Sequence, residues 1–315
     1  MSSLKPTHSI QVRAFAKINL GLSVFGKRAD GYHEIHTIYQ TVALHDRLEI
    51  QLQTRRGAGS RAANAGDIRV VCDDPTAPSG PQNLVYRACS LWKRARAFRG
   101  QVAVRLEKRI PAGSGLGGGS SDAGATLLAL EHLTGERLDQ AARLRLAARL
   151  GSDVPLFLHG GRVLGCGRGD EVHALDDLPR RRCLVVFPGF PVSTAEAYKA
   201  LRRRQTLGLT RTVRPPSISS FGARPQFPLA DWEPAENDFE HVVFAKWPEL
   251  AKLKRRLIRA GAEVASLTGS GSAVYAIFAS APQLLCASRL VPAGWQVFRT
   301  RTLSRAEYRR LLFRE

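Results

Sequence analysis

The sequence predicts a two-domain α+β protein. The chain has 315 residues, and domains of roughly 100–200 residues make two the natural division of that length. Segments in which apolar residues alternate, as in strands, are interspersed along the chain with segments in which they have helical spacing. The hydrophobic share of 44% is ordinary for a globular protein and excludes wholesale disorder. We expect domains over residues 1–165 and 166–315, the second a small α+β layer sandwich.

The first domain is expected to begin with a long strand. From Ile10 to Val24 apolar side chains recur at every second residue, with Lys17 and Asn19 on the opposite, polar face. Period two over this length predicts a strand or hairpin arm, and Asp30-Gly31 predicts the following turn. Further strands are expected at Leu48–Leu52, Ile68–Cys72, Val102–Leu106 and near Val163, helices at Asn83–Ala97, Ser121–Thr134 (capped by a serine) and Asp139–Leu150, and an exposed Arg/Gly-rich loop at Thr54–Gly66.

The second domain mixes short strands and helices. Strands are expected at Leu184–Phe187, Val264–Leu267, Ala273–Phe278 and Gln296–Arg301, and helices at Thr194–Arg203, Asn237–Ala245, Pro248–Ala260 and Pro282–Leu290. The Pro-rich segment Thr206–Pro228 is expected to be irregular.

The net charge of +20 raises the question of an anionic partner. A basic nucleic-acid-binding module is one hypothesis. The 38 arginines and 9 lysines are spread over the whole length without the interleaved aromatic residues of a base-stacking surface. A specific nucleic-acid partner is therefore not expected, and an anionic small molecule would be served equally well by the positive field.

The sequence contains no sign of membrane insertion, secretion or a metal site. It has no run of about 18 apolar residues, and Met1–Gln11 lacks an apolar signal core, so we expect a cytoplasmic protein without a membrane partner. Its five cysteines are scattered and form no C-x-x-C pair. Neither a disulfide framework nor a cysteine zinc site is predicted, and no metal ligand is assigned.

The glycine-rich segment Pro111–Ser121 carries the strongest chemical signal. It reads PAGSGLGGGSS between an expected strand and an expected helix. Glycines allow close approach of the backbone to a ligand, and a helix N-terminus favours an anion, so a phosphate group is the expected occupant. Ser120 and Ser121 can add hydroxyl donors or a magnesium ligand. The plain structural alternative is a flexible turn with a serine cap.

Three well-known phosphate loops fit this segment poorly. Walker A requires a lysine where Gly119 follows Gly118. The fingerprint G-x-G-x-x-G is matched by Gly113, Gly115 and Gly118, but a second helix follows instead of a strand ending in an acidic residue. A protein-kinase loop needs H-R-D and D-F-G partners, which are absent.

The segment instead resembles the loop of the GHMP kinases, P-x-x-x-G-L-G-[GS]-[GS]-S-A. Other motifs of that family occur in the same order: AKINL at Ala16–Leu20, RADGYH at Arg28–His33, NLV at Asn83–Val85, GSDVP at Gly151–Pro155 and TGSG at Thr268–Gly271. Together they span nearly the whole chain. The set is similar to the branch of the family that phosphorylates a cytidyl diphosphate polyol.

The resemblance implies a two-domain α+β GHMP kinase fold, with an N-terminal ribosomal-protein-S5-like domain and a C-terminal ferredoxin-like domain. It implies ATP and Mg²⁺ as cofactors, the 2-hydroxyl of the polyol as acceptor in non-mevalonate isoprenoid biosynthesis, and a monomer or homodimer. The alternative within the family is a kinase of mevalonate, homoserine or a sugar, against which Tyr32 and His33 speak.

The resemblance also assigns roles to single residues. Lys17 and Asp153 match the catalytic pair, in which a carboxylate accepts the hydroxyl proton and a lysine keeps it ionised and neutralises developing charge. Plain structural alternatives are a solvated strand residue for Lys17 and a helix N-cap for Asp153. The residues that match the nucleotide site are Pro111, Ala112, Gly113, Ser114, Gly115, Leu116, Gly117, Gly118, Gly119, Ser120, Ser121 and Asn83.

A cradle for the cytidyl group is implied in the same way. Tyr32 matches a tyrosine that stacks on cytosine and His33 a histidine that bonds the edge of the base. Tyr198 matches a second aromatic cover, and Asn19 a further substrate contact. Exposed-loop residues and, for Tyr198, a helix-core residue are the alternatives. The Gly269–Gly271 motif either shapes the wall near the acceptor or forms a tight turn.

Overall fold

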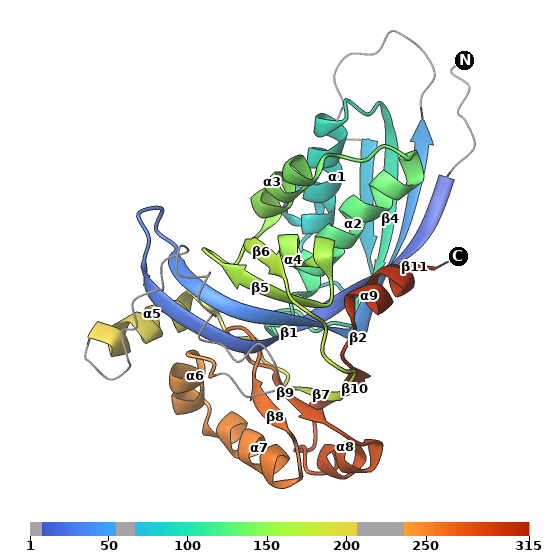
Figure 1. Ribbon diagram of the computed structural model, residues 1–315. Helices are drawn as coiled ribbons and strands as arrows, with labels where there is room; N and C mark the ends of the chain where they lie inside the picture. The colour runs from blue at the N-terminus through green and yellow to red at the C-terminus, as the bar shows by residue number, and fades with distance from the viewer. Residues whose placement is uncertain (1–7, 55–66, 207–235, 315) are drawn as a thin grey trace.

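The computed structural model describes residues 8–54, 67–206 and 236–314, which form two lobes, each built on one β-sheet (Figure 1). The larger sheet has seven strands and the smaller four. The expected irregular segments Thr54–Gly66 and Thr206–Pro228 lie, apart from their first residues, outside this description. Among the helices within it, none has the length and apolar character needed to span a bilayer.

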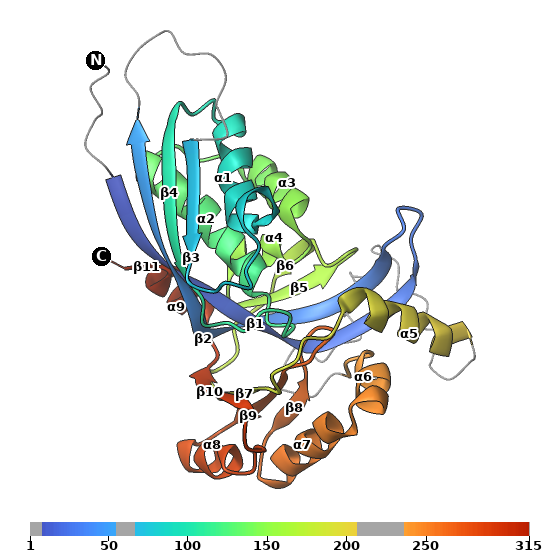
Figure 2. The ribbon, with the colours of Figure 1, turned by 180° about the vertical axis from the view of Figure 1, so that it is seen from behind.

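The larger sheet has the order β11-β1-β2-β4-β3, with β5 paired to β2 and β6 to β5. Its strands are β1 (His8–Lys27), β2 (His33–Thr54), β3 (Ile68–Cys72), β4 (Gly100–Glu107), β5 (Arg162–Cys166), β6 (Glu171–Ala174) and β11 (Phe313–Arg314). Its pairs are antiparallel except β3 with β4. The helices of this lobe are α1 (Leu84–Ala95), α2 (Gly118–Thr134), α3 (Gln140–Leu150), α4 (Val154–His159) and α9 (Arg305–Leu312). Figures 1 and 2 show α1, α2 and α3 together on one face of the sheet.

The β1–β2 hairpin is far longer than an ordinary strand pair, with 20 and 22 residues against a usual 5–6 or so per strand. One part of β2, residues 47–54, pairs with β4, and another, residues 37–40, pairs with β5. Register shifts between Phe15 and Lys17 and between Asn19 and Gly21 interrupt the ladder, and such bulges bend and twist a strand. Every residue of β1 from Ala14 to Leu22 is buried, so the face expected to be polar and solvated lies inside the protein.

The smaller sheet has the order β10-β7-β9-β8 and is antiparallel throughout. Its elements are β7 (Arg182–Phe187), α5 (Thr194–Thr206), α6 (Glu240–Lys246), α7 (Pro248–Arg259), β8 (Val264–Leu267), β9 (Val274–Phe278), α8 (Ala281–Ser288) and β10 (Gln296–Arg301). The sequence of one strand, helices, two strands, a helix and one strand, with this strand order, is the ferredoxin-like arrangement. The ferredoxin-like expectation for the second lobe is confirmed.

The smaller sheet buries both of its faces. Leu184 and Val186 of β7 point to the side that packs against α7, while Cys183 and Val185 pack against Ile18 of β1 and its neighbours. Side chains alternate across a strand, so one strand can serve two cores. The β1–β2 hairpin therefore lies between the lobes and is held by both of them (Figure 1).

The sheets divide the chain later than the expected boundary after residue 165. That position falls inside β5, and the next strand, β6, still pairs with β5 in the larger sheet. The smaller sheet begins with β7 at Arg182, and the C-terminal β11 returns to pair with β1. Hydrogen bonding between β5 and β6, which a composition change does not reveal, keeps the chain in the first lobe.

The start of α2 also differs from the expectation of a serine cap. The helix begins at Gly118, and its N-cap is Gly117 in the left-handed conformation, without a capping side chain. A serine cap near Ser121 is therefore wrong. The positive-φ glycine starts the helix one turn before its apolar periodicity becomes visible, which leaves three small residues in the first turn.

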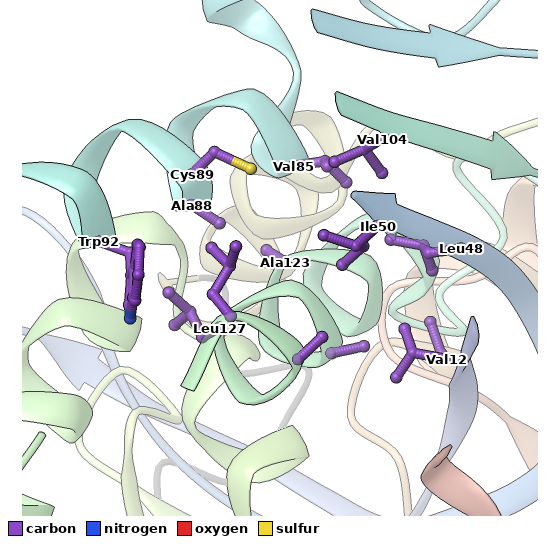
Figure 3. Packing of buried hydrophobic residues seen from close by; sticks show 14 of the residues in the cluster. Val12, Leu48, Ile50, Val85, Ala88, Cys89, Trp92, Val104, Ala123 and Leu127 are labelled. Carbon is purple, nitrogen blue, oxygen red and sulfur yellow. The ribbon is translucent and has the colours of Figure 1, made fainter. Parts of the chain in front are cut away.

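The first lobe has a core in which α1 and α2 pack on the sheet. Figure 3 shows Leu127 of α2 beside Trp92 and Ala88 of α1, with Ile50 of β2 nearby. Leu127 is 1% exposed and Trp92 is fully buried. Because α2 carries the end of the glycine loop, the packing of Leu127 supports the candidate site.

Replacing Leu127 by Ala should lower the free energy of unfolding by about 2–5 kcal/mol, since it removes buried methyl groups and leaves a cavity. Urea unfolding followed by circular dichroism measures this loss. Leu285→Ala is the matched control, because Leu285 on α8 is 47% exposed and should change stability by less than about 0.5 kcal/mol. Equal losses for the two variants would contradict the placement of Leu127 in the core.

Candidate active site

The glycine loop, Pro111–Gly117, connects β4 to α2 and touches both the hairpin and the second lobe. The N–H of Lys17 donates to the carbonyl of Leu116 at 3.0 Å, and the N–H of Ala273 donates to the carbonyl of Ser114 at 3.0 Å. Gly115 has φ +83°, and a Cβ there would lie 2.1 Å from the carbonyl oxygen of Thr268. Only glycine fits at this contact, so the loop and the Thr268–Gly271 turn are pressed together backbone to backbone.

A cavity of about 380 Å³ opens over the glycine loop and the start of α2. Its walls include Pro78, Asn83, Lys108 and every residue from Pro111 to Ser120. The first-turn N–H groups of α2 have no acceptor within the helix, and its dipole favours negative charge, so the cavity is suited to a phosphorylated ligand. Asn83 stands in the wall, where its side chain caps α1 by accepting from the N–H of Val85 at 2.8 Å.

Ser121 differs from its neighbours in the loop motif. Its hydroxyl is fully buried and donates to the carbonyl of Phe15 at 2.7 Å. This bond ties α2 to β1, whereas Ser120 stays partly exposed at the cavity. The sequence alone does not distinguish the two serines. They have different surroundings because successive residues on a helix point in directions about 100° apart.

Lys17 and Asp153, expected as a pair, lie side by side. The Lys17 Nζ is 3.6 Å from Asp153 Oδ2, with 3% of the lysine side chain and 30% of the aspartate side chain exposed. Burial lowers the pKa of Lys17, and the Asp153 carboxylate opposes that shift. The Asp153 side chain makes no capping bond to α4. The solvated-strand reading of Lys17 is therefore wrong, and the side chain of Asp153 points to the pair rather than to the helix end.

Asn19 connects three parts of the site. Its Oδ1 accepts from Lys17 Nζ at 2.7 Å and from the N–H of Gly269 at 2.8 Å. Its Nδ2 donates to Thr37 Oγ1 at 2.7 Å, and the residue is 1% exposed. The amide thus holds the ammonium of Lys17 and the Gly269 turn at fixed positions, which is a supporting role beside the substrate contact that the resemblance implies.

Tyr39 belongs to the same site, although sequence patterns did not single it out. Its hydroxyl donates to Asp153 Oδ1 at 3.0 Å, and Lys17 Nζ lies 5.5 Å from its ring centre. The residue is 2% exposed. Burial, followed by the charge of Asp153, raises the pKa of Tyr39 well above its ordinary value, so the hydroxyl keeps its proton. An alternating strand offers no motif for such a tyrosine, which only the β1–β2 register brings opposite Asn19.

The expected cytidyl cradle lies at the turn of the hairpin. Tyr32 is 53% exposed, with the guanidinium of Arg168 4.7 Å from its ring centre. His33 stacks on Tyr198 at 4.8 Å between ring centres, and its Nε2 is buried without a hydrogen-bond partner among the described residues. Tyr198 also meets Phe239 edge to face at 4.8 Å. His33 and Tyr198 are thus brought together, Tyr32 is next to His33 in the chain, and Tyr198 also packs against the core of the second lobe.

A buried cluster of Lys108, Asp46 and Asp122 holds the chain at the start of the glycine loop. Lys108 Nζ donates to Asp122 Oδ2 at 2.7 Å and to Asp46. Asp46 also accepts from the N–H of Ile110 at 2.8 Å, which holds the chain just before the loop. Burial and the neighbouring Asp46 carboxylate, against the attraction of Lys108, raise the pKa of Asp122 to about 8.

Comparison with known proteins decides the family. The model of the GHMP kinase N-terminal domain matches residues 83–161, and that of the GHMP kinase C-terminal domain matches residues 229–287. A 4-diphosphocytidyl-2-C-methyl-D-erythritol kinase of Solibacter usitatus is 42% identical over 308 residues, covering 98% of this chain and 93% of the relative. A kinase of the same name from Pelotomaculum thermopropionicum is 37% identical and covers 94% and 98%. The chain belongs to the 4-diphosphocytidyl-2-C-methyl-D-erythritol kinase family of GHMP kinases.

Solved structures agree with this membership. A crystal structure of a 4-(cytidine 5'-diphospho)-2C-methyl-D-erythritol kinase matches with a TM-score of 0.71 and 34% identity, over 93% of this chain and 99% of the other. The homoserine kinase of Cytophaga hutchinsonii matches with a TM-score of 0.64 at 18% identity, over 94% and 95% of the two chains. The second likeness shows the shared fold of GHMP kinases alone. ATP is the phosphate donor of this family.

The buried carboxyl below the loop of this GHMP kinase predicts a pH dependence of stability. Folded, Asp122 keeps its proton up to about pH 8, whereas an unfolded aspartic acid loses it near its ordinary value of 3.8. Unfolding between these values releases a proton, so this group makes stability fall as pH rises from about 4 to 8. Asp122→Asn should therefore weaken that pH dependence, measured by urea unfolding at several pH values.

Asp139→Asn is the control for this measurement. Asp139 caps α3 by accepting from the N–H of Ala142 at 2.7 Å, and asparagine caps a helix about as well. The control should keep the wild-type pH dependence. An Asp122→Asn variant whose stability falls with pH as steeply as that of the wild type would contradict a protonated Asp122.

Proposed function

We propose that this kinase transfers the γ-phosphoryl group of ATP to the 2-hydroxyl of 4-diphosphocytidyl-2-C-methyl-D-erythritol, a step of non-mevalonate isoprenoid precursor biosynthesis. The observation that carries the proposal is the Lys17–Asp153 pair, 3.6 Å apart and next to the glycine loop. Phosphoryl transfer needs positioning and charge stabilisation more than covalent help from the protein. The names of the relatives at 42% and 37% identity support the substrate.

In the proposed complex the triphosphate of ATP lies on the glycine loop and the first turn of α2. Backbone N–H groups from Gly117 to Ser120 face the phosphates, and the α2 dipole adds to the attraction. Asn83 and Leu84, which also line the cavity, lie beside the adenine in this proposal. Ser121 contributes through its bond to Phe15, which fixes the end of the loop.

Asp153 acts as the general base in this proposal. It takes the proton of the 2-hydroxyl while the hydroxyl oxygen forms a bond to the γ-phosphorus. The bond from that phosphorus to the β,γ-bridging oxygen breaks, and ADP leaves with the electron pair. The Lys17 ammonium offsets the negative charge that spreads over the transferred group.

Tyr32 and His33 would recognise the cytidyl group. A base can stack on the exposed ring of Tyr32, and stacking of this kind accepts every base. Discrimination needs hydrogen bonds to the edge of the base, and the Nε2 of His33, which has no hydrogen-bond partner within the described part of the chain, can provide one. Burial, followed by the charges of Arg202 and Lys27, lowers the pKa of His33, so the ring is neutral at pH 7 and can present either a donor or an acceptor.

Mg²⁺ would enter with ATP and supply charge neutralisation at the β- and γ-phosphates. Among the described residues no group of three or more His, Cys, Asp or Glu side chains is placed to hold a metal ion. Asp122 is occupied by Lys108, and the partly exposed hydroxyl of Ser120 in the cavity wall is a protein oxygen that could serve such an ion.

A coupled ADP-release assay with Mg-ATP tests the proposed acceptor. Four compounds are compared: 4-diphosphocytidyl-2-C-methyl-D-erythritol, mevalonate, homoserine and galactose. Turnover of the cytidyl compound alone is expected. Turnover of another acceptor, with the cytidyl compound inert, would keep the GHMP kinase family and overturn the substrate.

Replacing Asp153 by Asn should lower kcat by about 10²–10⁴-fold, because the amide cannot accept the proton. The ADP-release assay measures the loss with the cytidyl substrate. Asp176→Asn is the control, since Asp176 is an exposed carboxylate after β6, and it should keep wild-type kcat. If Asp153→Asn also kept it, the hydroxyl would transfer its proton elsewhere and the base role would be wrong.

A further inference from the structure

We propose that Tyr39 is a positioning residue that orients both members of the catalytic pair, its hydroxyl holding Asp153 and its ring supporting Lys17. This inference rests on the proposed function, in which Asp153 is the base. It concerns one side chain of this chain that neither the sequence motifs nor the glycine loop involve.

The first support is the hydrogen bond itself. The Tyr39 hydroxyl donates to Asp153 Oδ1 at 3.0 Å, while Lys17 Nζ lies 3.6 Å from Oδ2. The two partners thus engage different oxygens of the carboxylate and determine its rotation. Each oxygen keeps a further acceptor site, so the carboxylate can accept the hydroxyl proton in the orientation that these two partners determine.

The second support is the rigidity of Tyr39. Its backbone is paired with Asn19 of β1 on one side and with Val163 of β5 on the other. Groups placed on strands held from both sides are positioned more closely than groups on loops. Asp153, by contrast, lies between two short helices, is 30% exposed and makes no capping bond, so it needs an external partner to fix its rotation.

The third support is that two glycines, Gly165 and Gly169, lie against the ring and the hydroxyl of Tyr39. A Cβ at Gly165 would lie 2.5 Å from Tyr39 Cε2, and one at Gly169 would lie 2.6 Å from the Tyr39 hydroxyl oxygen. Larger residues at these two positions would displace the ring or its hydroxyl. The glycines at 165 and 169, which the sequence shows as part of a strand and turn, therefore make room for Tyr39.

The charged and titratable groups around Asp153 determine how far loss of the Tyr39 hydroxyl can change the ionisation of the carboxylate. They are Lys17 from β1, Tyr39 from β2 and Tyr198 from α5, with Asp170 acting on Tyr39 from the turn after β5. Among these, Lys17 and Tyr39 contact the carboxylate directly. A donated hydrogen bond favours the ionised form of a carboxylate, so loss of the Tyr39 hydroxyl should shift the ionisation of the base to higher pH.

Tyr39→Phe tests this, because it keeps the ring beside Lys17 and removes the hydroxyl. We expect kcat for the cytidyl substrate to fall by about 10- to 100-fold from the misplaced base, with KM values for both substrates within about twofold. The acidic limb of the pH profile of kcat should move up by about one pH unit. Tyr39→Leu also removes the ring contact to Lys17 and should lose more activity than Tyr39→Phe.

Tyr308→Phe is the matched control. Its hydroxyl is equally buried and donates to the carbonyl of Phe157 on α4 at 2.6 Å. This variant loses a buried tyrosine hydroxyl without touching Asp153, so it should lose stability and keep the wild-type pH profile. A matching shift in Tyr308→Phe would mean that the effect of Tyr39→Phe is general destabilisation.

NMR titration of the protein with ¹³C-labelled aspartate carboxyl groups measures the ionisation of Asp153 without any turnover. The Asp153 signal is assigned as the one that is missing in Asp153→Asn. The midpoint of that signal should move to higher pH in Tyr39→Phe. If the wild type is active and Tyr39→Phe keeps both its kcat and its titration midpoint, the role of Tyr39 is overturned. The proposed function is not affected by that result. A wild type without turnover of the cytidyl substrate would overturn the proposed function, whatever the midpoint does, and with it the catalytic role of Tyr39.

Discussion

Burial of the Lys17 ammonium is the constraint on which the rest of the site depends. A charged group that is 3% exposed must find partners for its charge and its donors, or lose its proton. Asn19, Asp153 and the ring of Tyr39 supply those partners from three places in the chain. An isolated surface lysine would need none of them. Burying this one charge is unfavourable unless these partners are present. The site therefore requires β1, β2 and the start of α4 to meet beside the glycine loop.

The long hairpin makes this convergence possible. It lies between the two lobes, so both faces of β1 are covered from Ala14 to Leu22, and the polar side chains of Lys17 and Asn19 point into an internal site. Asn19 bonds the Gly269 turn of the second lobe, and Lys17 bonds the glycine loop of the first. A ligand that spans the loop and the hairpin would contact both lobes through residues that are already connected. The arrangement is a preorganised site, in which little reorganisation remains for the moment of reaction.

The fold could be predicted wherever a local pattern decides it. The strands at Val264–Leu267 and Gln296–Arg301 have the predicted limits, because alternation and flanking turns mark them. α4 and α9, with six and eight residues, were not predicted. The first part of β2 was also missed: its residues from His33 to Ala43 mix polar and apolar types without regular alternation, and their pairing with β1 and β5 decides their structure.

The candidate site shows the same limit. Lys17, Asp153 and the glycine loop stand in motifs, and the structure brings them together. The position of Lys17 on a polar strand face suggested solvent, because the sequence does not show that the glycine loop, Asp153 and the Gly269 turn cover that face. Tyr39 stands in no motif, and its place follows from strand register and from the space left by two glycines, Gly165 on β5 and Gly169 in the turn after it. The buried Lys108 cluster likewise depends on Asp46, which is 62 residues away in the chain.

The central claim is that the acceptor hydroxyl meets Asp153 at the edge of the glycine loop. A crystal structure with a non-hydrolysable ATP analogue and 4-diphosphocytidyl-2-C-methyl-D-erythritol tests it most directly. We expect the 2-hydroxyl oxygen within about 2.6–3.2 Å of an Asp153 carboxylate oxygen, in line with the γ-phosphorus, and the γ-phosphate on the N–H groups at the start of α2. A 2-hydroxyl directed away from Asp153, with another group at that distance, would contradict it.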